Sequence, residues 1–356
     1  MVAHQYNGNI IVFRIGSLGD TLVALPAFHL LRKQYPQSKI ILLTNTPVDG
    51  GIKAAASHQI LMGSGLVDQF IEYPHGRFSL PALMRVISEI RKLKPQEVVY
   101  LMPRRTKLQR FRDALFFFIA GIWRVRGLFV AESANTHHKV PGGEYYESEA
   151  SRLIRSVGFD SNGLDQSLFS LVLQENERDT AKKILADISI PFIAISVGAK
   201  VPAKDWGSDR WFDLLKKLAG SLPNSYALVC FGSKDEFERC ESITSEWSGP
   251  VLNLCGALSP RESAAVLERA AIYVGHDSGP MHLASSVGIP CISIFAARDK
   301  PGVWFPYGNE ENVFYRNVPC SNCKLSVCTE HQMICIYSIE PEEVAERIHQ
   351  LLSAKL

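Results

Sequence analysis

Short apolar runs alternate with longer amphipathic stretches along most of this 356-residue chain. Apolar runs without polar alternation are typical of strands that are buried on both faces of a parallel sheet. Stretches with apolar residues at intervals of three and four are typical of helices. We therefore predict strands over residues 10–15, 39–44, 97–102, 192–197, 226–231, 271–274 and 291–295. We predict helices over residues 20–33, 80–93, 211–219, 235–247, 261–270 and 341–352.

This alternation predicts an α/β fold of two Rossmann-like domains, each a parallel sheet with helices on both faces. The polar stretch 174–187, which follows strand-like residues 168–173, separates the two series of elements. We place the first domain at residues 1–178 and the second at 179–339. A helix in 340–356 should dock on one of the cores, with the first as the candidate. Since open parallel sheets bind ligands at the carboxyl ends of their strands, two sheets facing across a cleft would bind two substrates.

Composition and charge narrow the class of protein. Hydrophobic residues at 46% and charged residues at 21% describe a globular chain, and a net charge of +2 does not favour a nucleic-acid partner. The longest apolar candidate, residues 114–123, is about half the length of a membrane span and predicts a buried or an interfacial helix. No signal peptide is apparent, and eight cysteines suit a reducing compartment, so we expect a cytoplasmic protein.

The segment around residues 271–286 predicts a phosphate site. An apolar strand is followed by a turn over Gly275–Pro280 and by helical spacing from Met281 onward. Unpaired backbone N–H groups and the positive end of a helix dipole attract a phosphate at such a point. Asp277 could accept sugar hydroxyls and His282 could donate to an anion, which points to a nucleotide-linked sugar.

Asp20 has two interpretations. It closes the turn Gly16-Ser-Leu-Gly-Asp20 between the first strand and the first helix, where Asp20 or Thr21 could simply cap that helix. Alternatively, the helix N-terminus keeps the carboxylate ionised so that it serves as a general base. A dinucleotide fingerprint is disfavoured because the G-x-G-x-x-G spacing is absent here.

Further charged residues follow predicted strands. Lys204 could meet a diphosphate and Glu236 could bind ribose hydroxyls, although both also suit an ordinary solvated surface. A basic cluster follows the strand at 97–102 and comprises Arg104, Arg105, Lys107, Arg110 and Arg112, with Arg124 and Arg126 nearby. It predicts a solvated helix face, or a patch for a phosphorylated or carboxylated acceptor at an anionic membrane surface.

The late cysteines form the pattern Cys320-x2-Cys323-x4-Cys328-x6-Cys335. Four thiolates at this spacing are compatible with a zinc or iron–sulfur site, but the pattern is not that of two separated C-x2-C pairs. Reduced thiols that pack a C-terminal loop are the favoured interpretation. The other four, Cys230, Cys240, Cys255 and Cys291, lie in or beside apolar segments and are predicted to be core residues.

Several of these motifs together resemble glycosyltransferase family 9, the ADP-heptose:lipopolysaccharide heptosyltransferases. The resemblance rests on the opening at 14–27, the Arg124-Val-Arg126-Gly element, and the run from Asp277 through 289–295 to 306–308. The cysteine-bearing tail ending at 339–344 resembles the family as well. Ala199-Lys200 and Ala296-Ala-Arg-Asp299 depart from the commoner family pattern near the expected nucleotide site.

The resemblance implies a GT-B fold and an inverting transfer that does not depend on a DxD-bound metal. It implies that Asp20 is the catalytic base, that Lys204 meets the diphosphate, and that Glu236 meets the ribose. Asp277 would contact the sugar, and Ser278, Gly279 and His282 the phosphates. We expect Arg104, Arg105 and Arg126 to receive the acceptor. The expected partners are an ADP-sugar donor, a lipid-linked or phosphorylated saccharide acceptor, and peripherally the inner face of the inner membrane.

Two other functions stay open at this stage. A GT-B nucleotide-sugar epimerase would need acid and base groups on both sides of the sugar and no acceptor. A non-catalytic nucleotide-sugar-binding protein would use the basic cluster for assembly.

Overall fold

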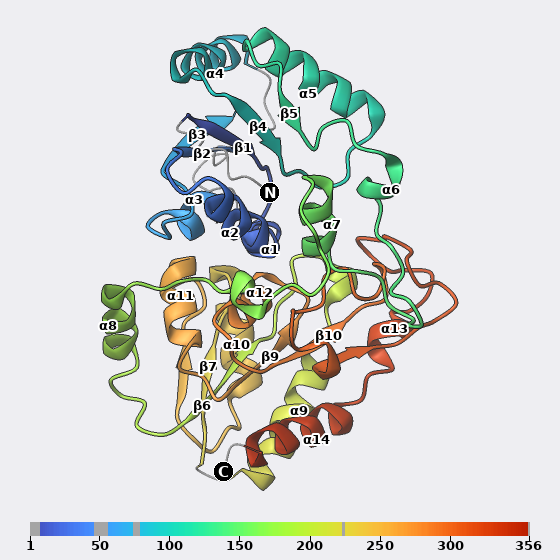
Figure 1. Cartoon of the computed structure of the whole chain (residues 1–356). Coiled ribbons are helices and arrows are strands. Elements are labelled where there is room, and N and C mark those ends of the chain that lie inside the picture. Colours follow the sequence, from blue (N-terminus) through green and yellow to red (C-terminus); the bar gives the residue numbers. More distant parts are fainter. Residues whose placement is uncertain (1–7, 46–55, 74–78, 223–224, 355–356) are drawn as a thin grey trace. The chain divides into compact units, whose positions relative to one another are not determined.

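Two compact units make up the chain in this computed structural model, which describes residues 8–45, 56–73, 79–222 and 225–354. Unit 1 comprises Met1–His138 and Glu147–Phe169, and unit 2 comprises Lys139–Tyr146 and Ser170–Leu356. Each unit contains one parallel sheet with helices on both faces (Figure 1), as the alternating pattern predicts. Within the described residues, no helix is both long and apolar enough to cross a membrane.

The sheet of unit 1 has the strand order β3-β2-β1-β4-β5 and is parallel throughout. Its strands are β1 (Ile10–Phe13), β2 (Ile40–Asn45), β3 (Gln69–Tyr73), β4 (Glu97–Tyr100) and β5 (Val125–Arg126). Every residue of β1 is buried, which explains its uninterrupted apolar character, and every residue of β4 is buried as well, including Glu97 at its start.

Helices cover both faces of this sheet (Figure 1). They are α1 (Leu18–Val23), α2 (Leu25–Gln34), α3 (Ala56–Leu61), α4 (Leu80–Leu93), α5 (Lys107–Ile119), α6 (Glu132–Asn135) and α7 (Glu149–Ser156), followed by the 3-10 turn Gln166–Phe169. Helices α4 and α5 lie on one face, and α1, α2, α3 and α7 lie on the other. Tyr100 on β4 donates a hydrogen bond of 2.6 Å to the buried carboxylate of Asp113, which fixes α5 to the sheet.

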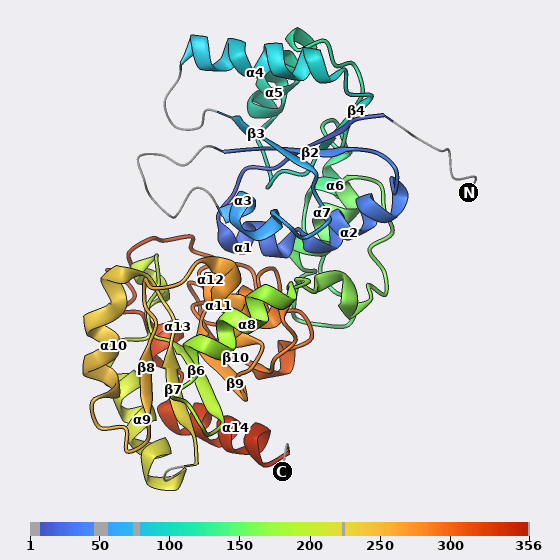
Figure 2. The same cartoon turned by 90° about the vertical axis from the view of Figure 1, so that its left-hand side faces the viewer.

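The sheet of unit 2 has the strand order β11-β10-β9-β6-β7-β8 and is also parallel. Its strands are β6 (Phe192–Ser196), β7 (Ala227–Cys230), β8 (Val251–Asn253), β9 (Ile272–His276), β10 (Cys291–Phe295) and β11 (Val313–Tyr315). Figure 2 shows this sheet from the side, with helices on both of its faces.

The helices of unit 2 complete its core. They are α8 (Glu175–Ile184), α9 (Ser208–Ser221), α10 (Phe237–Thr244), α11 (Pro260–Leu267), α12 (Gly279–Ser286), α13 (Ile334–Tyr337) and α14 (Pro341–Ser353), with 3-10 turns at Pro202–Lys204, Lys234–Glu236 and Glu310–Asn312. Val344, Ile348 and Leu352 of α14 belong to the core of unit 2, together with Trp206 and Trp211. The candidate docking of 340–356 on the first domain therefore differs from the observed packing, because this apolar stripe is buried on unit 2.

The division between the units also differs from the prediction. The expected boundary at about residue 178 falls inside α8, whereas the division by contacts lies between Phe169 and Ser170. Residues 168–173 form no described strand, because Leu171 donates its N–H to Ser286 instead of to a sheet. The segment between α6 and α7 is divided between the units as well, since Lys139–Tyr146 belongs to unit 2.

The winding of the chain reverses in each sheet. In unit 1 the chain proceeds outward from β1 through β2 to β3 and then restarts on the other side of β1 with β4. In unit 2 the same reversal falls between β6 and β9, which pair directly. Ligands of such sheets bind beside the carboxyl ends of the strands at this reversal, because the two connections leave in opposite directions.

A buried ion pair lies below the carboxyl edge of the first sheet. Arg152 donates to both oxygens of Glu149 at 2.7 and 2.6 Å and also to the carbonyl oxygen of Met102 at 3.0 Å. The ring of His137 lies 2.8 Å from the same carboxylate. Burial alone would raise the pKa of Glu149, but the hydrogen bonds from Arg152 and His137 lower that pKa to about 2.

We predict that this pair makes the stability of unit 1 sensitive to acid. Since the pKa of Glu149 is about 2 in the folded protein and 4.5 ordinarily, its contribution is fully present above pH 4.5 and is lost as the pH falls toward 2. That difference corresponds to about 3 kcal/mol of unfolding free energy. Denaturant unfolding measured at several pH values should show the loss in wild type.

The variants Glu149→Gln/Arg152→Met and Glu132→Gln provide the comparison. The double variant removes both charges, so its free energy of unfolding should depend less steeply on pH. Glu132→Gln should leave that pH dependence unchanged, because the Glu132 side chain is 56% exposed. An equally steep loss of stability in the double variant would contradict the role of Glu149.

Candidate functional site

Asp20 occupies the third position of helix α1, at the carboxyl end of β1. Ser17 is the N-cap of this helix, and its backbone N–H and its hydroxyl both donate to Oδ2 of Asp20, at 2.7 and 2.6 Å. The N-cap is thus Ser17, and Asp20, at the third helical position, completes a capping box with one of its two oxygens. The side chain remains 25% exposed, so the carboxylate is also accessible for chemistry.

Arg14 holds the turn that presents Asp20. Its fully buried guanidinium donates to the carbonyl oxygens of Leu101, at 3.1 Å, and of Asp20, at 2.5 Å. The Oδ1 atom of Asp20 lies 3.9 Å from the same guanidinium. Burial lowers the pKa of Arg14 from its ordinary value, while the charges of Asp20 and Glu149 oppose that shift. Arg14 thus joins the two connections that follow β1 and β4.

The basic residues of unit 1 fall into two groups. Arg104 and Arg105 follow β4 at its carboxyl end, and Arg104 forms an exposed ion pair of 2.8 Å with Glu132. Arg126 instead donates to Gln34 at 3.1 Å and lies over the rings of Tyr35 and Phe159. The Nε atom of Arg126 is 3.9 Å from Glu97, the first residue of β4. The structure therefore places Arg126 toward the amino end of β4, away from the other two arginines.

In unit 2, the loop after β6 and the end of β9 meet through an ion pair. The Nζ atom of Lys204 lies 2.5 Å from Oδ2 of Asp277, and both side chains are largely buried. Lys204 ends the 3-10 turn after β6, and Asp277 directly follows β9. The structure thus brings together two predicted site residues that are 73 positions apart in sequence.

A buried histidine fixes this meeting point. The Nε2 atom of His276 accepts hydrogen bonds from the backbone N–H of Trp206 at 3.1 Å and from the indole N–H of Trp211 at 3.3 Å. Its Nδ1 atom lies 3.2 Å from the carbonyl oxygen of Gly198, an arrangement that fits a neutral ring donating there. Burial lowers the pKa of His276 to about 4, which keeps the ring neutral near pH 7.

Further charges gather beyond β10. Asp299 accepts from Lys324 at 2.6 Å and from Arg298 at 3.0 Å. Burial raises the pKa of Asp299, but Lys324, Arg298 and Lys204 together lower it overall. Lys204 is therefore paired with Asp277, and its charge also helps to lower the pKa of Asp299. These two carboxylates follow adjacent strands, β9 and β10.

Glu236 lies over the carboxyl ends of β6 and β7. Its Oε2 atom accepts the backbone N–H of Ser233 at 2.6 Å in a second capping box. A Cβ atom at Gly198 would overlap the Glu236 carboxylate, so a glycine is needed for this close approach. The predicted donor residues Lys204, Asp277 and Glu236 thus all lie at one edge of the sheet.

The remaining predicted donor residues belong to α12. Ser278 is the N-cap in an extended conformation, Gly279 is the first helical residue, and the hydroxyl of Ser278 makes no capping bond within the described helix. His282 is buried on the same helix, with its ring 6.5 Å from that of Trp304. The positive end of this helix is therefore adjacent to Asp277, as the strand-turn-helix pattern predicts.

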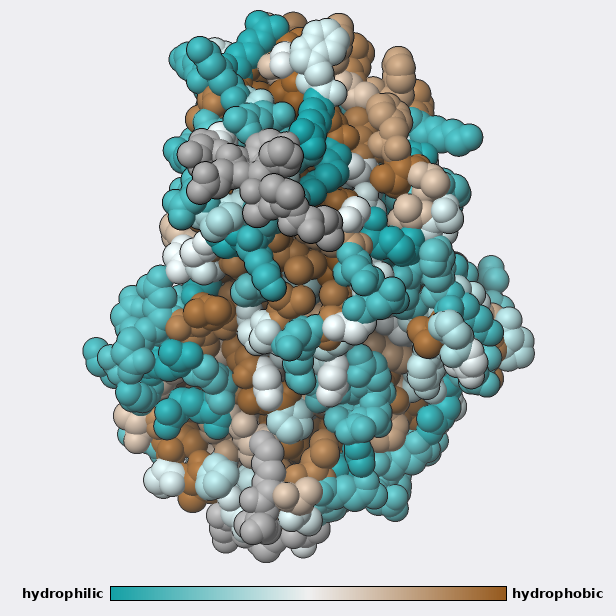
Figure 3. All heavy atoms as spheres, viewed as in Figure 1, coloured by the Kyte–Doolittle hydropathy of each residue, from teal (hydrophilic) through white to brown (hydrophobic). Residues whose placement is uncertain are grey.

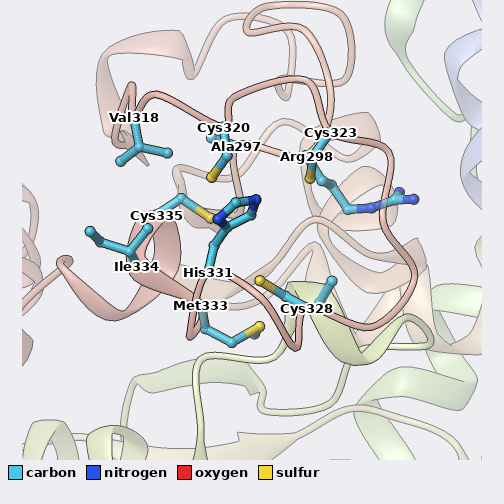
Figure 4. A pocket seen from close by; sticks show the side chains of 11 residues that line it. Ala297, Arg298, Val318, Cys320, Cys323, Cys328, His331, Met333, Ile334 and Cys335 are labelled. Carbon is cyan, nitrogen blue, oxygen red and sulfur yellow. The ribbon is translucent and has the colours of Figure 1, made fainter.

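The four late cysteines line one small cavity with His331 (Figure 4). All four are free thiols, and Cys230, Cys240, Cys255 and Cys291 are buried in the core as predicted. Within the described ranges, no group of three or more His, Cys, Asp or Glu side chains is arranged to hold a metal ion. Ala203, next to Lys204, also lines this cavity and donates its N–H to Ser326 at 3.0 Å. The cysteine-bearing segment thus packs against the loop that carries Lys204.

Sequence reasoning missed three residues that build these edges. Arg14 and His276 lie at strand ends, but a single charged or aromatic residue in an apolar run gives no sign of its partners. His137 contacts Glu149, 12 positions away, a partner that no local spacing indicates. The position of Arg14 one residue beyond β1 was the available signal, because an arginine fully buried there must have acceptors.

Comparisons with known proteins agree with this architecture. The sequence model of glycosyltransferase family 9 (heptosyltransferase) matches residues 123–334. Lipooligosaccharide heptosyltransferase 2 of Campylobacter jejuni is 26% identical over 47% of this chain and 57% of its own length, so less than two thirds of that relative is spanned. Lipopolysaccharide heptosyltransferase 3 of Escherichia coli is 25% identical over 85% of this chain and 88% of its own.

A solved structure matches along nearly the whole chain. The ADP-heptose lipopolysaccharide heptosyltransferase II of Escherichia coli has a TM-score of 0.71 and 19% identity, covering 98% of this chain and 99% of that one. At this identity the likeness concerns the fold, and it confirms the predicted GT-B type with two parallel sheets. Because the family model matches more than half of the sequence, this chain belongs to glycosyltransferase family 9.

Proposed function

We propose that this protein transfers a heptose from ADP-heptose to a saccharide acceptor of the lipopolysaccharide core type, with inversion at the anomeric carbon. Family membership and the names of the relatives support the reaction class. The observation that carries the proposal is the Lys204–Asp277 pair at the winding reversal of unit 2. A lysine and a helix N-terminus beside the carboxyl ends of two strands suit the diphosphate of a nucleotide sugar.

On the donor side, Lys204 and the start of α12 would hold the diphosphate. Negative charge builds on the leaving phosphate as the bond to the sugar breaks, and a fixed ammonium group and helix dipole stabilise that charge. Asp277 would contact the sugar hydroxyls, and Glu236 the ribose. The ion pair with Asp277 holds the charge of Lys204 in place before the donor arrives.

On the acceptor side, Asp20 would act as general base. The acceptor oxygen forms the new bond to the anomeric carbon, its proton goes to the Asp20 carboxylate, and the electron pair of the broken bond leaves with ADP. The mechanism requires the Asp20 carboxylate to reach the acceptor hydroxyl that attacks the anomeric carbon of the donor. The basic residues Arg104 and Arg105 would receive the acceptor's anionic groups, whereas the packing of Arg126 in unit 1 favours a supporting role.

We predict that Asp20→Asn loses catalysis while retaining the fold and ADP affinity. The amide oxygen can still accept the hydrogen bonds of Ser17, but the amide cannot take up the acceptor proton. Turnover should fall by about 10²–10⁴-fold. Steady-state kinetics and ADP titration calorimetry measure the two effects separately.

Ser17→Ala is the matched control. It removes the N-cap hydroxyl, at a cost of about 1 kcal/mol in stability, but leaves the carboxylate as a base. We expect this variant to keep turnover within about tenfold of wild type, well above that of Asp20→Asn. Turnover of Asp20→Asn at the level of the control would show that Asp20 is not the base.

We predict that Lys204→Met weakens the binding of ADP by at least about tenfold, since a charge-assisted contact to a phosphate is lost. Lys200→Met is the control, because Lys200 is exposed on the same loop and should change the affinity little. Calorimetric titration with ADP checks both variants without an acceptor. Unchanged affinity in Lys204→Met would remove Lys204 from the donor site.

A further inference from the structure

An exposed apolar row runs along one face of helix α5 in unit 1. Its members are spaced by three and four residues, which places them on one side of the helix: they are Leu108, Phe111, Leu115 and Phe118. Leu108 is 78% exposed and Phe111 is 64% exposed. The opposite side of α5 carries Phe116 and Phe117, which are buried in the core. Figure 3 shows hydrophobic side chains gathered over α5, at the upper right.

The row continues beyond the end of the helix. The indole of Trp123 is 79% exposed, and its ring lies edge-on to that of Phe118 with centroids 4.8 Å apart. On the neighbouring helix α4, which Arg91 ties to the carbonyl oxygen of Ile119, Met84 is exposed as well. An apolar face with tryptophan at its border is typical of helices that lie in a membrane interface.

Positive charge is concentrated in the same part of the chain. Residues 80–126 contain eleven Lys and Arg residues against three Asp and Glu residues, a net charge of +8. Because the whole chain carries only +2, all other residues together carry −6. This segment, which contains α4, β4, α5 and β5, is therefore the basic part of a protein that is otherwise acidic.

The basic side chains border the apolar row. Lys107 begins α5, Arg112 lies within it, and Arg124 directly follows Trp123. Arg112 and Arg124 are each paired with one carboxylate, Asp113 at 2.7 Å and Glu97 at 3.1 Å, yet their side chains remain about 60% exposed. Both can therefore still meet an external anion while their aliphatic stems cover apolar surface.

We propose that this face of α5, with Trp123, docks unit 1 on the surface of an anionic lipid bilayer. The helix would lie in the plane of the interface, with its apolar row between the headgroups and acyl chains and its basic residues among lipid phosphates. The inference goes beyond the transfer reaction and depends on neither Asp20 nor Lys204. A single partner, the lipid surface, would explain both the exposed apolar side chains and the positive charge of this surface.

The charge argues against a second copy of the chain as that occupant. Most dimers use the same patch on both subunits, so two strongly basic surfaces would face each other. Like charges brought together at an interface repel, whereas a bilayer with anionic headgroups supplies the opposite sign over an extended plane. Of these two occupants, the lipid surface is the one that satisfies both the apolar row and the positive charge.

Vesicle cosedimentation of the full-length protein tests the proposal. We expect binding to mixed phosphatidylglycerol and phosphatidylcholine vesicles, weaker binding at high salt, and little binding to phosphatidylcholine alone. Phe111→Glu/Phe118→Glu should lower the affinity at least about tenfold, and Lys107→Glu should lower it about fivefold or more. Val172→Glu, at an exposed apolar position in unit 2, should leave it unchanged. Circular dichroism and ADP binding check that each variant is folded.

Three outcomes would overturn the proposal. The first is equal binding by wild type and Phe111→Glu/Phe118→Glu when both are folded. The second is binding only to vesicles that contain a saccharide lipid, since the surface would then recognise an acceptor instead of a bilayer. The third is a wild-type dimer in sedimentation velocity that the Phe111→Glu/Phe118→Glu variant dissociates, since a second copy would then cover the row.

Discussion

The reversal of winding beside the first strand of each sheet is the constraint on which the candidate site depends. All strands of a parallel sheet end at the same edge, but only at the reversal do two adjacent connections diverge and leave that edge open. Arg14 and Asp20 follow β1 in unit 1, and Lys204 and Asp277 follow β6 and β9 in unit 2. Among the described residues, chemistry-bearing side chains thus stand at the winding reversal of each sheet, where sheets of this kind bind ligands.

Buried polar groups give these open edges a defined shape. His276 joins the loop after β6 to the end of β9 with hydrogen bonds on both ring nitrogens, so neither element shifts without leaving a polar atom unsatisfied. Arg14 joins the connections after β1 and β4 in the same way through two carbonyl oxygens. In both units a single buried side chain fixes two loops that are remote in sequence. Neither residue needs to touch a substrate to matter for binding it.

Much of the fold could be predicted because long apolar runs and helical spacing are local signals. The strands at 10–13 and 291–295 and the helix at 80–93 follow directly from such patterns. The edge strands Val125–Arg126, Val251–Asn253 and Val313–Tyr315 were missed, because they are short and only partly buried. One helix was predicted where α1 and α2 are separate, since Pro26 favours a new helix start just after Ala24. Pairings such as Lys204 with Asp277 depend on topology, which spacing does not encode.

The assignment of Lys139–Tyr146 to unit 2 bears on any attempt to exchange halves between members of this family. The ring of Tyr146 lies under the ammonium group of Lys300, its N–H donates to the carbonyl oxygen of Pro301 at 2.8 Å, and the ring of Tyr145 meets that of Phe305 edge-on. A chimera with one crossover near residue 170 would combine this hairpin from one parent with its docking surface from the other. A chimera that exchanges unit 2 therefore needs two segments, 139–146 and 170–356, from the same parent.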